Sequence, residues 1–143
     1  MRALGVDFGE RRIGLALSDG EGRMALPFRV VERSSDAAAI AAIAALAREH
    51  EVGRLVVGLP HRSGEGPPSE TLERARSFGE KLAAATGLEV EWVDEAYTSA
   101  AAAERLREAG LDARRARPRL DAVAAQILLQ EALDRRRSGE ERK

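Results

Sequence analysis

The run over residues 55–59 is the feature that most restricts how this chain can fold. Five apolar or small residues follow one another without polar alternation, and the run stops at Pro60. A strand of this kind is buried on both faces, and such strands are typical of parallel sheets that are covered by helices. The run therefore predicts an α/β domain.

Further strands are predicted on both sides of this run. Residues 3–8 and 13–17 are short apolar segments separated by a turn, and they predict a hairpin. A third strand around residues 26–31 extends this antiparallel part, and Pro27 either confines it to an edge or interrupts its start. Residues 90–93 predict the last strand.

Helices are predicted between and after these strands, from cap residues and from apolar residues at helical spacing. Their expected positions are a first helix after Ser34, Ser35 and Asp36, a second over residues 70–86 ended by Gly87, a third from Thr98 or Ser99 to about residue 109, and a terminal helix that starts after Pro118. This order predicts a mixed sheet with helices on both faces. We expect one domain over residues 1–137 and a flexible tail over 138–143.

Composition narrows the chemistry. The chain has 143 residues, a formal net charge of −1 and no cysteine. The length fits one domain, and the missing cysteines exclude disulfides, thiolate metal sites and a thiol nucleophile. The near-neutral charge means that any affinity for phosphate must be local. No stretch is long enough to cross a bilayer, so we expect a cytoplasmic protein without a membrane partner.

Three separate elements carry acidic residues at places suited to a site. Asp7 stands inside an apolar strand, where a carboxylate is costly without a partner, although it is also a common turn cap beside a glycine. Asp94 and Glu95 follow the last strand, and because successive residues face opposite ways we favour Glu95 as the ligand. Asp121 stands in the predicted first turn of the terminal helix, where it would also complement the helix dipole.

Taken together, Asp7, Glu95 and Asp121 predict an all-oxygen metal site. Carboxylates suit hard cations that keep some of their water, so the expected ion is Mg²⁺ or Mn²⁺. Two such ions about 4 Å apart, bridged by Asp7, would activate a water and stabilise the leaving oxygen of a phosphodiester. Basic side chains would hold the phosphates of the nucleic acid. The candidates are Arg12, Arg62 and the cluster Arg114, Arg115, Arg117 and Arg119.

Several short motifs occur in an order that resembles one known family. They are Asp7-Phe8-Gly9, Arg12-Ile13-Gly14-Leu15-Ala16, Val56-Val57-Gly58-Leu59-Pro60, Asp94-Glu95 with Thr98-Ser99, and Asp121 with Ala124-Ala125. Over nearly the whole chain this pattern is similar to the YqgF family, also described as Holliday junction resolvase-like or pre-16S ribosomal RNA nuclease. The chain departs from the family at Ala96, where Arg is frequent, and at His61-Arg62-Ser63.

The resemblance implies a ribonuclease H-like fold, with three antiparallel strands followed by parallel ones, and a metal site at Asp7, Glu95 and Asp121. It favours a nuclease that processes the 5′ end of pre-16S rRNA. The alternatives are a nuclease for Holliday junctions or single-stranded DNA, and a noncatalytic RNA-binding factor of ribosome assembly. An ATPase on the related actin-like fold would need a second domain, for which the chain has no room. A monomer or a homodimer is compatible with these expectations, and symmetric cutting of a junction would require the dimer.

Overall fold

The structure is a computed structural model that describes residues 1–9, 11–59, 70–94 and 113–141, with the side chains of 113–120 and 137–141 left out of the description. Five strands and three helices lie in these ranges. In chain order they are β1 (Arg2–Asp7), β2 (Arg12–Ser18), β3 (Ala25–Glu32), α1 (Asp36–Glu49), β4 (Val52–Leu59), α2 (Glu70–Thr86), β5 (Val90–Asp94) and α4 (Ala113–Glu141).

The five strands form one mixed sheet in the order β3-β2-β1-β4-β5. β1 pairs antiparallel with β2, and β2 pairs antiparallel with β3. β4 is parallel to both β1 and β5. The predicted combination of antiparallel and parallel strands is therefore confirmed, and Pro27 lies in the edge strand β3 as its missing N–H requires.

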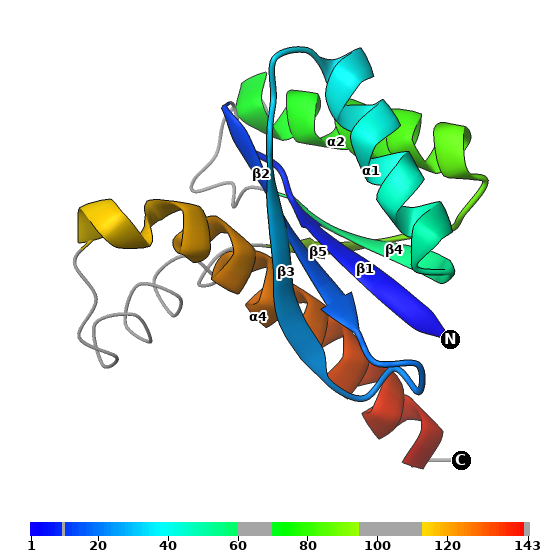
Figure 1. Ribbon diagram of the computed structural model, residues 1–143. Coiled ribbons are helices and arrows are strands. Elements are labelled where there is room, and N and C mark those ends of the chain that lie inside the picture. Colours follow the sequence, from blue (N-terminus) through cyan, green and yellow to red (C-terminus); the bar gives the residue numbers. More distant parts are fainter. Residues whose placement is uncertain (10, 60–69, 95–112, 142–143) are drawn as a thin grey trace.

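Helices cover both faces of the sheet (Figure 1), as predicted. α1 and α2 pack on the face that carries the larger side chains of β1, such as Leu4 and Val6. α4 packs on the other face, where β1 presents Ala3 and Gly5. The small residues on this second face let the backbone of α4 approach the strands closely, which matters for the position of the acidic residues.

Local signals place the start of α1 and the end of α2 where the sequence predicts them. The Ser35 hydroxyl accepts a hydrogen bond from the Ala38 N–H at 3.1 Å, which satisfies one of the free donors at the start of α1. α2 covers residues 70–86, and Gly87 after it has a φ of 72°, a left-handed conformation that glycine adopts without strain.

The start of α4 corrects the sequence prediction. The helix begins at Ala113 and continues through Pro118, so Asp121 lies roughly two turns inside it instead of in its first turn. Helix-dipole effects fall off within the first turn, so complementing the dipole no longer explains this acid. The same shift places Arg114, Arg115 and Arg117, which precede the predicted start, on the helical backbone that also carries Arg119.

At its other end α4 continues to Glu141, so helical backbone extends into the segment predicted as a tail. The helix expected over residues 98–109 lies outside the described residues. None of the described helices is long and apolar enough to cross a membrane.

Candidate carboxylate site

Asp7 is the last residue of β1 and is half-buried at the carboxyl end of that strand. In the antiparallel pairing it stands opposite Gly14 of β2. Directly opposed residues of two strands point to the same face of a sheet, and so do residues two apart on one strand. Gly5 faces Ala125 and Leu129 of α4, so Asp7 also lies on the face that α4 covers.

Gly14 is the point where α4 rests on the sheet. A Cβ atom at this position would collide with the carbonyl oxygen and carbon of Asp121, and it would lie 3.0 Å from the backbone nitrogen of Ala122. The backbone of Asp121 therefore occupies the space in which a side chain of residue 14 would stand. Since neighbouring strands are about 4.8 Å apart, this contact brings Asp121 beside Asp7.

Arg12 joins the same cluster. It lies two residues before Gly14 on β2, and its Nε atom is 3.2 Å from Oδ2 of Asp121. Oδ2 is enclosed and the contact is an ion pair, not a well-directed hydrogen bond. The side chains of Arg12 and Asp121 keep 36% and 30% of their surface exposed. One cation thus offsets part of the negative charge at a site that solvent still reaches.

Asp94 lies on the other side of the sheet. It is the exposed last residue of β5 and pairs in register with Leu59, whose side chain packs against the core under α1 and α2. Asp94 is therefore separated from Asp7 by the sheet. Glu95 itself lies outside the described residues, and its role stays a prediction.

The predicted phosphate-binding residues are placed only in part. Arg12 lies in the cluster with Asp121, and Arg62 is outside the described residues. The backbones of Arg114, Arg115, Arg117 and Arg119 belong to the two turns of α4 that precede Asp121. At a rise of 1.5 Å per residue, these positions lie within about 11 Å of Asp121 along the helix axis. The backbone of the predicted cluster therefore lies at the same end of α4 as Asp121.

Two carboxylates of this site, from Asp7 and Asp121, fall in the described part of the chain. Within that part, no group of three or more acidic, histidine or cysteine side chains has an arrangement that would hold a metal ion. The donor chemistry of Asp7 and Asp121 suits a hard divalent cation, and a third ligand would have to come from outside the described ranges.

Sequence reasoning missed the role of Gly14 and the partner of Arg12. A glycine within an apolar strand often marks close approach of another backbone, so the signal was available at Gly14. Which backbone approaches was not, because Asp121 is more than one hundred residues away in the chain. Arg12 was predicted as a phosphate contact, and the structure also pairs it with Asp121.

Comparison with known proteins adds to this geometry. The sequence profile of the RuvX family, described as Holliday junction resolvase, matches residues 1–135. A protein of Anaeromyxobacter sp. (strain Fw109-5) is 48% identical over 95% of this chain and 98% of its own length. A protein of Chloroflexus aurantiacus (strain ATCC 29366 / DSM 635 / J-10-fl) is 43% identical over 97% of this chain and 90% of its own length. Both carry the name "Putative pre-16S rRNA nuclease".

Solved structures resemble the fold at low sequence identity. RuvC of T. thermophilus, in complex with a Holliday junction substrate, matches with a TM-score of 0.64 and 19% identity over 96% of both chains. The fowlpox virus Holliday junction resolvase matches with a TM-score of 0.55 and 13% identity, over 92% of this chain and 97% of the viral one. The predicted ribonuclease H-like fold is confirmed by these matches.

Proposed function

This chain belongs to the RuvX family of Holliday junction resolvases, which is the YqgF family that its motifs resemble, and on that premise we propose that it is a nuclease. The proposed reaction is hydrolysis of phosphodiester bonds in nucleic acid. The observation that carries the proposal is the contact of the Asp121 backbone with Gly14, directly opposite Asp7. Two carboxylates from elements far apart in the sequence meet there at one end of the sheet.

The proposed enzyme depends on Mg²⁺ or Mn²⁺, held by Asp7, Glu95 and Asp121. A bound divalent ion would lower the pKa of a water molecule and neutralise charge that develops on the phosphate. Asp7 and Asp121 supply negative charge at fixed positions, because a strand end and a strand-packed helix hold them. Arg12 stands beside Asp121 and is positioned to bind a phosphate of the substrate. Arg62, Arg114, Arg115, Arg117 and Arg119 are the further proposed phosphate contacts.

The proposed substrate is the 5′ region of pre-16S rRNA, in keeping with the names of the relatives. This substrate would place the protein in the cytoplasm, in ribosome biogenesis. A second candidate is a four-way DNA junction in recombination, which the description of the family favours. Symmetric cleavage of a junction would need a two-fold dimer, whereas trimming of an RNA end requires only a monomer. A noncatalytic role in ribosome assembly is the third.

One experiment separates these candidates. Purified protein is incubated with 5′-extended 16S rRNA fragments, single-stranded DNA and four-way junctions, each with Mg²⁺, Mn²⁺ or EDTA. Asp7→Asn and Asp94→Asn are compared with wild type, since both remove one carboxylate at a strand end but on opposite faces of the sheet. We expect metal-dependent cleavage that Asp7→Asn abolishes and Asp94→Asn retains.

Each other outcome has a definite meaning. RNA binding without cleavage under every metal condition would leave the noncatalytic assembly role. Cleavage of junctions alone, by a protein that sediments as a dimer, would select the recombination role. Equal loss of activity in Asp7→Asn and Asp94→Asn would contradict the assignment of the site to the face covered by α4.

A further inference from the structure

A second cluster of charged side chains lies at the end of the sheet opposite Asp7. It surrounds a cavity of about 570 Å³ between the start of β1, the turn after β2 and the last described side chains of α4. Three arginines line this cavity, Arg23, Arg54 and Arg136, against one carboxylate, Glu21. A smaller cavity of about 260 Å³ reaches the start of β5 and shares Arg54 and Arg136. The larger cavity thus has an excess of positive charge.

Arg54 is the unusual member of this cluster, because only 7% of it is exposed. Its Nη1 donates a hydrogen bond to Glu91 Oε1 at 3.2 Å, which uses one of the five N–H donors of a guanidinium group. In the described part of the chain, no nitrogen of Arg54 is both fully enclosed and without a hydrogen-bond partner. Arg54 lines both cavities, and four of its five N–H donors are not used by Glu91.

Arg136 acts on Arg54 electrostatically. Burial lowers the pKa of Arg54, the positive charge of Arg136 lowers it further, and Glu91 opposes both effects. Arg54 and Arg136 also line the same two cavities, so their positive charges lie on shared walls. An anion between two guanidinium groups would relieve this repulsion and accept hydrogen bonds from both.

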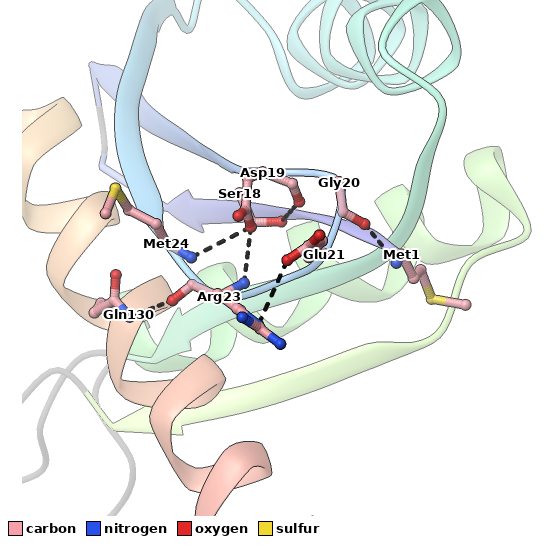
Figure 2. A network of polar contacts seen from close by, with 8 residues as sticks. All are labelled: Met1, Ser18, Asp19, Gly20, Glu21, Arg23, Met24 and Gln130. Atoms are coloured by element: carbon pink, nitrogen blue, oxygen red, sulfur yellow. Dashed lines mark hydrogen bonds and ion pairs between the residues drawn. The ribbon is translucent and has the colours of Figure 1, made fainter.

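The third arginine, Arg23, lines the larger cavity and belongs to a turn with many hydrogen bonds (Figure 2). Asp19 Oδ1 accepts hydrogen bonds from the backbone N–H of Arg23 at 2.7 Å and of Met24 at 3.3 Å. Gln130 of α4 donates to the Arg23 carbonyl at 2.9 Å, and the ammonium group of Met1 donates to the Gly20 carbonyl at 2.8 Å. The backbone of Arg23 is thus fixed, while its side chain remains 70% exposed beside Glu21.

We propose that this cavity binds a phosphate group of the nucleic acid, as a contact separate from the carboxylate site. The identity of the ligand rests on the proposed function. The location of the binding site rests on Arg23, Arg54 and Arg136, which line the cavity. Arginine is suited to this role because its planar fork of donors matches the oxygens of a phosphate. The contact carries no base specificity and serves to position the substrate.

The length of α4 sets the spacing between the two sites. Asp121 and Arg136 are 15 residues apart on this helix, which corresponds to about 22 Å along its axis. One strand of a duplex advances about 3.4 Å per nucleotide, so a duplex that reaches both sites needs roughly six to seven nucleotides between them. Substrates shorter than this contact only one site.

The test compares two neighbouring arginines of α4. Arg136 lines both cavities, whereas Arg135 is 61% exposed, pairs with Glu131 at 2.7 Å and lines neither. Arg136→Gln, Arg135→Gln and Arg23→Gln therefore remove equal charge from different places. Binding of fluorescent duplexes of about 5 and about 16 base pairs is measured in EDTA over a range of salt concentrations, so that cleavage does not interfere.

We expect Arg136→Gln and Arg23→Gln to weaken binding of the long duplex about three- to tenfold. The slope of log K against log salt should fall by about 0.9 for Arg136→Gln, as expected for the loss of one phosphate contact. Arg135→Gln should match wild type, and the short duplex should bind all variants alike. A second readout is the NMR signal of the Arg54 Nε–H, which should shift on addition of the long duplex.

Three results would overturn the inference in different ways. Equal binding by Arg136→Gln and Arg135→Gln, with wild type still binding nucleic acid, removes this contact and leaves the proposed function intact. A shift of the Arg54 signal with inorganic phosphate but not with the duplex makes the cavity a site for free phosphate. Failure of wild type to bind any nucleic acid defeats the proposed function, and this inference with it.

Discussion

Replacing Gly14 by alanine tests the contact that brings the two carboxylates together. The added Cβ would overlap the backbone carbonyl of Asp121, which is held in a helix and cannot rotate away as a side chain would. To restore an ordinary contact, α4 has to move from β2 by roughly an ångström. Asp121 moves with it, because the collision is with its own backbone.

The size of the effect follows from the cost of overpacking. Inserting a methyl group into a closely packed contact typically destabilises a protein by about 1–3 kcal/mol. For a domain of this size each kcal/mol lowers the melting temperature by about 2–4 °C, so we expect a decrease of roughly 2–12 °C. The loss in metal binding should be larger in relative terms, since carboxylate ligands tolerate little displacement.

Two other glycines provide matched controls. A Cβ at Gly5 would lie 2.8 Å from the Cβ of Leu129 and 3.0 Å from the Ala125 carbonyl oxygen, so it also presses on α4, but at the next turns of the helix. A Cβ at Gly20 would meet nothing within 4 Å. Melting temperatures of Gly14→Ala, Gly5→Ala and Gly20→Ala are measured in EDTA and in Mn²⁺, together with cleavage rates.

We expect Gly20→Ala to melt as wild type does, and Gly5→Ala to melt lower while it keeps the stabilisation by Mn²⁺. Gly14→Ala should melt lower and lose both most of that stabilisation and cleavage. If Gly14→Ala melts with wild type and responds normally to Mn²⁺, then α4 does not rest on β2 at Asp121, and the reasoning about the site is refuted.

Three further predictions concern charge. Asp7→Asn should reduce cleavage at least about 100-fold, as the loss of a preorganised electrostatic contact does. In EDTA the variant should melt no lower than wild type, because the substitution removes a negative charge beside Asp121. A much lower melting temperature would make Asp7 a structural turn residue. Hydrogen bonds from the backbone of Arg23, and then of Met24, lower the pKa of Asp19 below its usual value of 3.8. Asp19 thus stabilises the fold above its unfolded-state pKa and loses this effect as pH falls through the lowered one, so urea titrations of Asp19→Asn and wild type should differ at pH 7 and converge in acid. Nucleic-acid affinity should fall as the salt concentration rises, because the net charge of −1 leaves only local arginines to bind phosphate. Such contacts weaken over roughly 50 to 200 mM salt, so a constant affinity over this range would contradict the role of the arginines.

The elements whose limits depend on neighbouring residues could be predicted from the sequence. The buried run at residues 55–59, the cap at Ser35 and the stop at Gly87 are local signals, and each is found where it was expected. The start of α4 was predicted wrongly, because Pro118 and the arginines around it resemble a loop before a helix. In the structure the helix already begins at Ala113. Local propensity is a weak guide where tertiary packing of a long helix decides its length.

The sequence by itself identified the residues that we propose carry the chemistry, since Asp7 and Asp121 are acidic residues within apolar patterns and Arg12 is a cation close to the first of them. Only the tertiary structure decided how they meet. The absence of a side chain at Gly14 lets α4 touch β2, and through that contact Asp121 reaches Arg12 and the end of β1. A contact between residues so far apart in the chain depends on the packing of whole elements, which no local pattern encodes.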